Sequence, residues 1–420
     1  MLRSHSRFSV AARAALGLLV GVAACDEGKL LRPAGSIPVD PMFTRYVSVG
    51  NSITAGFQSG GINEATQSQS YAVLLAGRMR TPFYIPAMAF PGCPSLYTNV
   101  FTQTRVAPTV PCALRKTDPV PAPYINNVAV PGAEVMDAVS NLDPASNANA
   151  LTTFFLGGLT QLEMLERVGP TFVTVWIGNN DALGAATSFT NAGDSTLITP
   201  AATFAQRYDA MMTAIDAANP AGGVLVGVAK VTAIPFFSLG STYWAIDNGQ
   251  VPGQAFPPTF VVDNNCAPDV TMIPGARGDQ TLVPFPYGGA LLAAAAAGAP
   301  AALSCADTVR QVVVPSELVA LATAVATYNQ TVSAAATARG WAYFDPNPTL
   351  DSLRAIFTEV APFPAFADAM GNPTPCSTNP FGLSFSCDAV HPAAKTHKLI
   401  ANKLLQQINA TYGTSLTPVP

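Results

Sequence analysis

The chain has 420 residues, of which 49% are hydrophobic and 11% are charged, and its formal net charge at pH 7 is -4. A chain of this length can bury a sizeable core, either as one large domain or as a domain with a subdomain. The apolar content excludes a disordered chain, and the lack of a long basic run in the sequence speaks against nucleic-acid binding. The low charge is consistent with an exported protein. The 37 prolines and 32 glycines predict long irregular connections over a regular scaffold.

The N-terminus carries the features of an export signal. Arginines at positions 3, 7 and 13 precede an apolar stretch at residues 14–24, which is too short to span a bilayer but suits a signal-peptide core. Residues 22–25, VAAC, resemble the lipobox of bacterial lipoproteins, in which the cysteine receives a lipid. We expect a signal peptide at 1–24, a lipid anchor at Cys25 and a tether at 25–43, with the protein on the periplasmic face or the cell surface. The alternative is an ordinary cleaved secretory signal.

Six cysteines remain after Cys25, and an even number in an exported chain predicts three disulfides. Pairing between sequence neighbours is the simplest connectivity, and the other connectivities stay open. Metal binding is the weaker alternative, because no two cysteines have C-x-x-C spacing and histidine is scarce. The disulfides are expected to staple irregular loops, and the simplest pairs are Cys93–Cys112, Cys266–Cys305 and Cys376–Cys387.

Apolar runs alternate with helical patterns along a domain expected at residues 44–412, followed by a tail at 413–420. This alternation predicts a parallel sheet covered by helices on both faces. A segment at 236–314 breaks the pattern with Pro, Gly and aromatic residues, and we expect an insertion that caps the carboxyl edge of the sheet. The predicted strands are residues 46–49, 124–130, 171–177, 223–231 and 341–344, and the predicted helices are residues 70–80, 151–168, 200–218, 317–338 and 392–408.

The stretch YVSVGNSITAG at residues 46–56 places Ser52 at a turn between a strand and a helix. In a doubly wound sheet such turns lie at the carboxyl ends of the strands, where ligands bind. The following helix offers free backbone N–H groups to an anion. A turn of this kind is often only structural, so a catalytic role for Ser52 depends on whether the chain supplies a base and an oxyanion hole.

A serine hydroxyl is a poor nucleophile unless a base accepts its proton, and histidine is the usual base. His391 follows Asp388 with D-x-x-H spacing, just before the last predicted helix. This spacing lets the carboxylate reach the Nδ1–H group within one turn and leaves Nε2 free to face a serine. The alternative is a helix-entry histidine capped by Asp388. We expect His397, inside the predicted helix, to lie on the helix surface.

Attack on an ester carbonyl places negative charge on oxygen, so the site also needs hydrogen-bond donors. Gly132 follows a predicted strand in a turn where the missing side chain lets its backbone N–H approach a substrate. Asn180 follows the clearest apolar strand and carries an amide that donates without being a base. Each residue alone is typical of a turn or a helix cap, and we expect Asp181 to cap the helix that follows.

Four short blocks of the sequence, in this order, resemble those of the SGNH hydrolases, also called the GDSL esterase and lipase family. The blocks are GNSI at 50–53, NVAVPG at 127–132, GNND at 178–181 and DAVHP at 388–392. The resemblance implies a three-layer α/β/α flavodoxin-like sandwich with a mainly parallel sheet, here carrying a large irregular insertion. It implies no cofactor and no metal.

The resemblance also implies a role for each site residue. Ser52 would be the nucleophile, His391 the general base and Asp388 the residue that orients the imidazole. The oxyanion hole would combine the backbone N–H groups of Ser52 and Gly132 with the side chain of Asn180. The chain departs from the family at Asn51 and Ile53, where aspartate and leucine are usual. An asparagine can keep a side-chain hydrogen bond in the turn while it loses the charge.

These observations favour a lipid-anchored serine esterase or lipase that hydrolyses acyl esters of a lipid or an acylated glycan through an acyl-enzyme. One alternative is an acyltransferase or deacetylase that acts on surface glycan or peptidoglycan. Another is a surface lipoprotein that binds glycan or lipid without turnover. The sequence does not indicate the acyl length, the membrane to which the anchor belongs or the oligomeric state.

Overall fold

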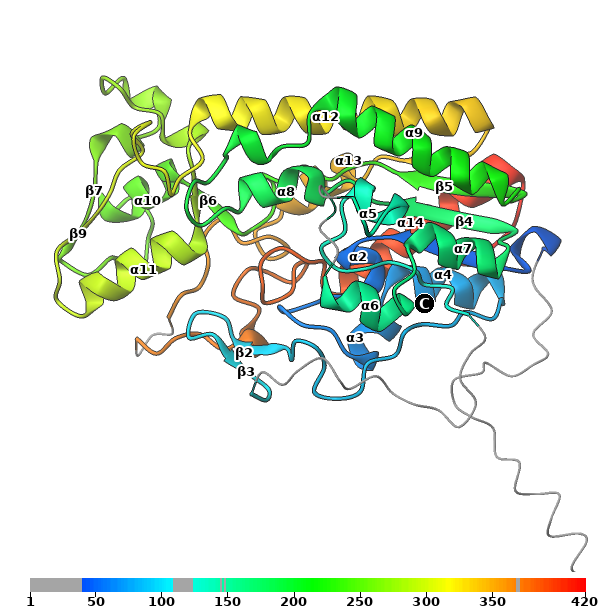
Figure 1. Ribbon diagram of the computed structural model, residues 1–420. Helices are drawn as coiled ribbons and strands as arrows, with labels where there is room; N and C mark the ends of the chain where they lie inside the picture. The colour runs from blue at the N-terminus through cyan, green and yellow to red at the C-terminus, as the bar shows by residue number, and fades with distance from the viewer. Residues whose placement is uncertain (1–39, 109–123, 144–145, 147–148, 368–370) are drawn as a thin grey trace, which may run out of the picture.

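The computed structural model describes residues 40–108, 124–143, 146, 149–367 and 371–420. At its centre lie four parallel strands in the order β1 (Tyr46–Gly50), β4 (Phe172–Trp176), β5 (Gly222–Val226) and β10 (Ala342–Phe344) (Figure 1). Every residue of β1, β4 and β5 is buried, because helices cover both faces of the sheet. The strands predicted at 46–49, 171–177 and 341–344 are confirmed, with small differences at their ends.

The segment at residues 126–130 runs beside β1 and extends the parallel arrangement. The backbone N–H of Ser48 bonds to the carbonyl of Asn126, and the N–H of Val128 bonds to the carbonyl of Ser48. The order of parallel segments is therefore the flavodoxin-like 2-1-3-4-5. The prediction of a regular strand at 124–130 is wrong, because this segment pairs with β1 only through an isolated bridge between Ser48 and Asn127. The N–H groups of Asn126 and Asn127 instead share the carbonyl of Tyr84.

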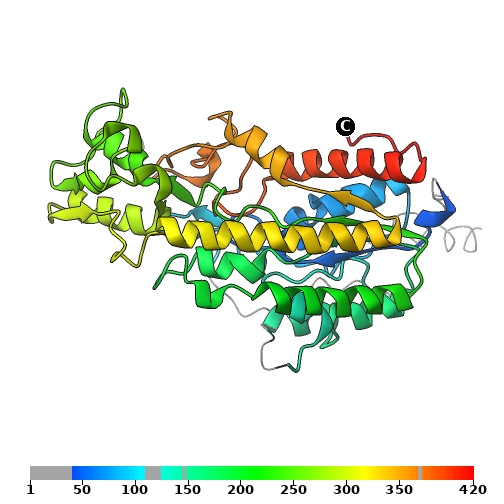
Figure 2. The same ribbon diagram turned by 90° about the horizontal axis from the view of Figure 1, so that it is seen from above.

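Helices cover the sheet on both faces and complete three layers, which confirms the predicted α/β/α class. Alternate residues of β4 divide between the layers: Phe172 and Trp176 join the core on one face, and Val173 and Val175 join the core on the other. Figure 2 shows the long helices α9, α12 and α14 running in nearly the same direction. The first face is covered by α4 (Tyr71–Met79) and α14 (Ala394–Tyr412), and the second by α5 (Val135–Val139), α7 (Gln161–Val168), α8 (Asn180–Ala186), α9 (Ala201–Ala217) and α12 (Pro315–Arg339).

Two predicted elements end earlier than the sequence pattern indicated. The helix predicted at 151–168 is divided into α6 (Ala150–Leu156) and α7, because Gly157 ends α6 with φ 66°, a left-handed conformation that glycine adopts readily. The strand predicted at 223–231 ends at Val226. Beyond it, the side chain of Asn329 bonds to both the N–H and the carbonyl of Val228, at 2.6 and 3.0 Å, in place of a neighbouring strand.

The predicted insertion at residues 236–314 folds as a lobe beside the sheet domain (Figure 1). Its own apolar cluster includes Tyr243 and Trp244 and surrounds the disulfide between Cys266 and Cys305. Because α12 starts directly after the lobe and runs antiparallel to the strands, the lobe lies at the carboxyl end of the sheet. Its elements are β6 (Phe237–Leu239), α10 (Gly240–Asp247), β7 (Phe260–Val262), β8 (Leu282–Pro284), α11 (Phe285–Ala296) and β9 (Ala301–Leu303).

The remaining elements lie in the connections of the sheet domain. They are α2 (Ser52–Ala55), α3 (Glu64–Ser68), β2 (Tyr97–Asn99), β3 (Thr104–Arg105) and α13 (Asn347–Arg354). None of the helices within the described ranges has the length and apolar character needed to cross a bilayer. The predicted signal peptide, the anchor at Cys25 and most of the tether lie outside the described residues and stay predictions.

Candidate active site

Ser52 is the first residue of α2, directly after β1, as the sequence predicted. Gly50 ends the strand where a side chain would not fit, because an added Cβ would lie 2.8 Å from the carbonyl oxygen of Trp176. The side chain of Gln161 holds both the N–H and the carbonyl of Gly50, each at 2.9 Å. Asn51 caps α2 by accepting the N–H of Ile53 at 3.1 Å, so the expected side-chain hydrogen bond in the turn is confirmed. The turn thus fixes the position of Ser52.

Asp388 and His391 form a hydrogen-bonded pair in the turn before α14. Oδ2 of Asp388 lies 2.9 Å from Nδ1 of His391, and the two side chains are only 11% and 13% exposed. Oδ1 of Asp388 accepts the backbone N–H groups of Val390 and His391, at 3.0 and 2.9 Å. The carboxylate therefore shapes the turn and contacts the ring, as the D-x-x-H spacing predicted. The ring of Phe57 packs against the imidazole with centroids 4.8 Å apart.

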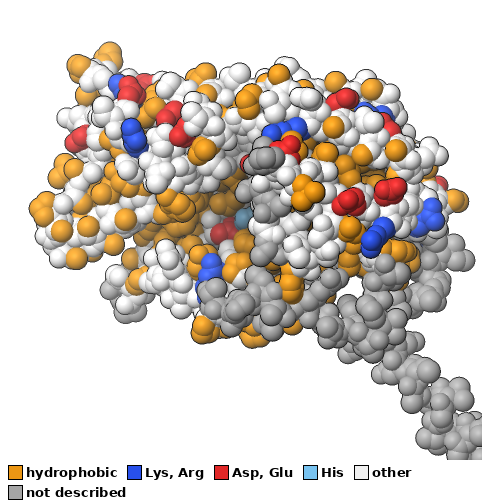
Figure 3. Space-filling view, viewed as in Figure 1, with side chains coloured by type: hydrophobic (Ala, Val, Ile, Leu, Met, Phe, Trp, Pro, Cys, Tyr) orange, Lys and Arg blue, Asp and Glu red, His pale blue; other side chains and the backbone are white. Residues whose placement is uncertain are grey.

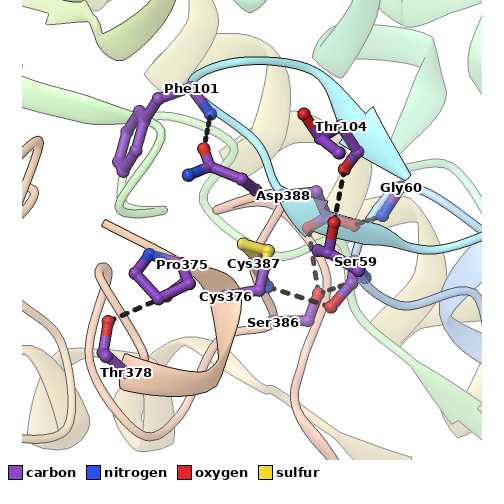
Figure 4. The surroundings of a disulfide bond; sticks show 12 residues. Ser59, Gly60, Phe101, Thr104, Pro375, Cys376, Thr378, Ser386, Cys387 and Asp388 are labelled. Carbon is purple, nitrogen blue, oxygen red and sulfur yellow. Dashed lines mark hydrogen bonds between the residues drawn. A yellow bond between two sulfur atoms is a disulfide. The ribbon is translucent and has the colours of Figure 1, made fainter. Parts of the chain in front are cut away.

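The carboxylate of Asp388 is also held by the loop that follows α2. The N–H of Gly60 donates to its Oδ2 at 2.7 Å, and the hydroxyl of Ser386 donates to its Oδ1 at 3.0 Å (Figure 4). Burial alone would raise the pKa of Asp388, but the charge of His391 and the hydrogen bonds from His391 and Gly60 outweigh it and lower the pKa to about 2. Asp388 is therefore ionised at neutral pH.

Hydrogen bonds of Ser59 and Ser386 join the loop after α2 to the turn before α14. The N–H of Ser59 donates to the hydroxyl oxygen of Ser386 at 2.9 Å, and the hydroxyl of Ser59 accepts the N–H of Cys387 at 3.2 Å (Figure 4). Cys387 in turn forms a disulfide with Cys376. We refer to these contacts of Ser59, Gly60, Ser386 and Asp388 as the serine clasp. The sequence analysis missed it, because partners more than 300 positions apart leave no local signal.

Two of the three simplest disulfide pairings are confirmed, Cys266 with Cys305 and Cys376 with Cys387. Cys112 lies outside the described residues, so its pairing with Cys93 stays a prediction.

Gly132 and Asn180 lie next to each other at the carboxyl end of the sheet. Nδ2 of Asn180 donates to the carbonyl of Ala133 at 2.8 Å, which ties the start of α8 to the turn at Gly132. Gly132 has φ 85°, a conformation that other residues rarely adopt. Within the described part of the chain, the backbone N–H groups of Ser52 and Gly132 donate no hydrogen bond.

A single cavity brings most of the candidate residues together. Ser52, Asn180 and His391 all contribute to its wall, together with Asn51 and Asn179. Gly132 is not part of this wall, and no hydrogen bond joins Ser52 to His391 in the described structure. Unliganded sites often have such loose contacts, which tighten when substrate binds. Figure 3 shows a hollow bordered by hydrophobic side chains, with a histidine and an acidic side chain at its base.

Two expectations about neighbouring residues are wrong. His397 is fully buried instead of lying on the helix surface, because α14 packs this side against α4. Its Nδ1 accepts the N–H of Tyr71 at 3.4 Å, and burial lowers its pKa to about 3, so it is neutral. Asp181 does not cap its own helix. Its Oδ2 accepts the N–H of Val135 at 3.0 Å and so caps the start of α5.

The insertion contributes nothing to the wall of this cavity among the described residues. The sequence analysis expected residues 236–314 to cap the carboxyl edge of the sheet, and the lobe lies at that end. The apolar wall of this cavity comes from the loop after β5, from α13 and from α14. The helical spacing of apolar residues in α13 was present in the sequence, yet nothing local indicates that this face borders a cavity.

Comparison with known proteins gives one match by family and several by structure. The GDSL-like lipase/acylhydrolase family model matches residues 46–404. No curated protein matches the chain. Similar solved structures include a variant of Axe2, an acetyl xylan esterase from Geobacillus stearothermophilus, with 11% identity over 90% of this chain and 97% of that chain, at a TM-score of 0.37.

Two further solved structures are similar at the same level. The extracellular lipase of Streptomyces rimosus has 15% identity over 88% of this chain and 99% of its own, at a TM-score of 0.36. Esterase EstA of a Pseudoalteromonas species has 10% identity over 88% of this chain and 100% of its own, at a TM-score of 0.35. At this level of likeness, the substrates of those enzymes do not transfer to this chain. The family model, however, runs from the first strand of the sheet into its last helix, and the chain therefore belongs to the GDSL-like lipase/acylhydrolase family of carboxylic ester hydrolases.

Proposed function

We propose that the chain is a serine esterase in which Ser52 attacks the acyl carbon and His391 accepts the serine proton. The alcohol then leaves with that proton, and an acyl-enzyme forms on Ser52. Water then attacks the acyl carbon while His391 takes its proton, and His391 returns this proton to the Ser52 oxygen as the acyl–oxygen bond breaks and the carboxylic acid leaves. Asp388 accepts a hydrogen bond from the Nδ1–H group of His391. Because its carboxylate is ionised, it stabilises the positive charge of the protonated imidazole.

The negative oxygen of each tetrahedral intermediate needs donors that are in place before the reaction. The backbone N–H groups of Ser52 and Gly132 have no partner among the described residues and could supply two of them. The amide of Asn180 has two N–H bonds and uses one on the carbonyl of Ala133, which fixes its plane. The second N–H bond supplies the third donor in this proposal.

The observation that carries the proposal is the location of Ser52 and the Asp388-bound His391 on one cavity. Ser52→Ala and His391→Ala should each abolish hydrolysis of p-nitrophenyl butyrate while the thermal midpoint stays nearly unchanged. Wild-type turnover by purified Ser52→Ala would refute the assignment. Asn180→Ala should lower kcat by roughly 10²–10³-fold, as removal of one oxyanion donor does elsewhere. An effect on KM alone would argue against an oxyanion role for Asn180.

Water is the acceptor in this proposal, and a sugar hydroxyl would make the same acyl-enzyme an acyltransferase. Product analysis with and without an acylated-glycan acceptor separates the two reactions. Transfer to the sugar at the expense of free acid would favour the transferase. A lipoprotein that binds without turnover would show neither product.

We further propose that the enzyme is exported and anchored through Cys25. The support is the arginine-containing apolar segment at 1–24 and the lipobox-like residues before the cysteine. Metabolic labelling with a fatty-acid analogue tests this proposal, since labelling should disappear in Cys25→Ser.

A further inference from the structure

The cavity that begins at Ser52 extends well beyond the groups needed for chemistry. The space between its walls measures about 800 Å³ when the open solvent at its mouth is included. Much of its wall is made of apolar side chains from three parts of the chain: Val231 and Ile234 after β5, Leu350 and Leu353 of α13, and Ile400 of α14. We propose that this cavity binds the acyl chain of the substrate and that the enzyme prefers butanoyl to octanoyl esters over acetyl esters, an inference that rests on the proposed serine-esterase function.

The wall is continuous because two helices present one face each. Residues 349, 350 and 353 share one face of α13, and residues 396 and 400 share one face of α14; residues 346 and 392 line the cavity just before each helix begins. Between these helices, Trp176 and Phe344 close the cavity at the carboxyl ends of β4 and β10. Leu350, Phe344 and Ile400 are each less than a tenth exposed, so a ligand that enters this space leaves water.

Two polar side chains of this apolar wall, Lys230 and Thr396, are engaged within the protein. Lys230 pairs with Asp351 at 2.6 Å at the rim, where both side chains are about half exposed. The hydroxyl of Thr396 donates to the carbonyl of Ser384 at 2.7 Å. A sugar or polyol in this part of the cavity would leave hydroxyl groups without partners, at a cost that a hydrocarbon chain does not incur. The chemistry of the wall therefore favours hydrocarbon.

The proposed reaction indicates that the cavity binds the acyl group of the ester and not the alcohol. The acyl group stays bonded to Ser52 until water arrives, so a cavity that binds it serves both steps. The alcohol must take a proton from His391 and then leave. A wall of buried apolar residues next to Ser52 suits the group that stays, whereas the departing alcohol needs a route to solvent.

A chain-length series tests the proposal in the intact protein. Values of kcat/KM for p-nitrophenyl acetate, butyrate, hexanoate and octanoate should rise, by up to about fourfold for each added methylene that is fully buried. Ethyl, butyl and hexyl acetates, which lengthen the alcohol instead, should show no such rise. A kcat/KM that does not change with acyl length, or that rises only with the length of the alcohol, would overturn the proposal. Loss of turnover in Ser52→Ala would still support the esterase function in that case.

A cavity-filling variant locates the binding site. Leu353→Trp should lower kcat/KM for octanoate by about tenfold relative to acetate, because the indole takes space for several methylenes. Ser352→Trp, on the exposed side of the same helix, should keep the wild-type ratio of octanoate to acetate activity. Retained acetate activity shows that a variant has folded. If Leu353→Trp does not fold, Leu350→Phe replaces it, and equal losses on acetate and octanoate would contradict the proposal.

Binding can also be measured without turnover. The chain has 3 tryptophans, and Trp176 lines the cavity. In the Ser52→Ala protein, 8-bromooctanoate should quench the fluorescence of Trp176, and the quenching should be lost in Ser52→Ala/Trp176→Phe. Unbrominated octanoate should compete with 8-bromooctanoate for the cavity and so relieve the quenching. Equal quenching with and without Trp176 would show that octanoate binds elsewhere and would overturn the proposal. This result does not depend on which residue is the nucleophile.

Discussion

Gly60 and Asp388 are 328 positions apart in the sequence, yet the backbone N–H of Gly60 donates a hydrogen bond of 2.7 Å to Oδ2 of Asp388. Gly60 belongs to the loop that follows α2, and Asp388 belongs to the turn that carries His391. The bond therefore connects the segment of the proposed nucleophile to the segment of the proposed base. Its donor helps to keep the carboxylate ionised.

Ser386 should act as a positioning residue through Asp388. Its hydroxyl donates to Oδ1 of Asp388 and accepts the N–H of Ser59. Ser386→Ala should lower the free energy of unfolding by about 2 kcal/mol, since a hydrogen bond to a charged group is lost. Steady-state kinetics with p-nitrophenyl butyrate should show a lower kcat with KM little changed, because Ser386 does not line the cavity. Ser386→Thr keeps the hydroxyl and should recover most of kcat; failure to do so would count against a positioning role.

The two confirmed disulfides should differ in their effect on activity. The loop-closure estimate for removal is about 3 kcal/mol for Cys376–Cys387 and about 4 kcal/mol for Cys266–Cys305. The first disulfide is attached to the serine clasp, whereas the second lies in the lobe. The double variant Cys376→Ser/Cys387→Ser should therefore lose kcat at a temperature where Cys266→Ser/Cys305→Ser retains it. Equal kcat losses in both double variants, measured where both are folded, would be the opposite result.

Asp181 should make stability depend on pH near neutrality. Burial raises its pKa from 3.8 to about 7, with a further contribution from the charge of Glu134. Between pH 4 and pH 7 the folded protein holds a proton that the unfolded chain has lost, so the free energy of unfolding falls as pH rises. The fall attributable to Asp181 over this window is about 4 kcal/mol.

Asp181→Asn cannot ionise but keeps an oxygen for the N–H of Val135. Its free energy of unfolding should be flatter between pH 4 and pH 7 and higher than that of the wild type above pH 7. Urea denaturation at several pH values measures both quantities. Parallel profiles for the two proteins would show that Asp181 does not titrate in this window.

Asn51 should matter mainly as the cap of α2. Asn51→Ala should lower the free energy of unfolding by about 1 kcal/mol and reduce kcat, because the cap fixes the first turn of the helix that begins at Ser52. Asn51→Asp keeps an acceptor for the N–H of Ile53, and its charge is favourable at a helix start, so it should stay close to wild-type stability. A fully stable Asn51→Ala protein would show that the cap contributes little.

The sequence predicted the parts of the fold that depend on local patterns. The buried strands could be recognised because parallel strands covered on both faces are apolar at nearly every position, as in β4. The Asp388–His391 pair could also be predicted, because its geometry is set within one turn. The early end of β5 could not, since it depends on the side chain of Asn329, which comes from a distant helix.

The site was predictable to a similar extent. Ser52, Asn180 and His391 could be recognised from their blocks, and they do share a cavity. The serine clasp and the apolar wall between α13 and α14 could not be predicted, because each joins segments that are far apart in the chain. The burial of His397 was missed for the same reason, since the part of α4 that covers it precedes it by more than 300 positions.

The central claim is that Ser52 is a nucleophile activated by His391, and labelling with a fluorophosphonate probe tests it most directly. Peptide mass spectrometry of the labelled wild-type protein should find the adduct on Ser52, and labelling should be lost in Ser52→Ala and strongly slowed in His391→Ala. An adduct on another serine that persists in Ser52→Ala, or ester hydrolysis by a protein that takes no label, would contradict the account.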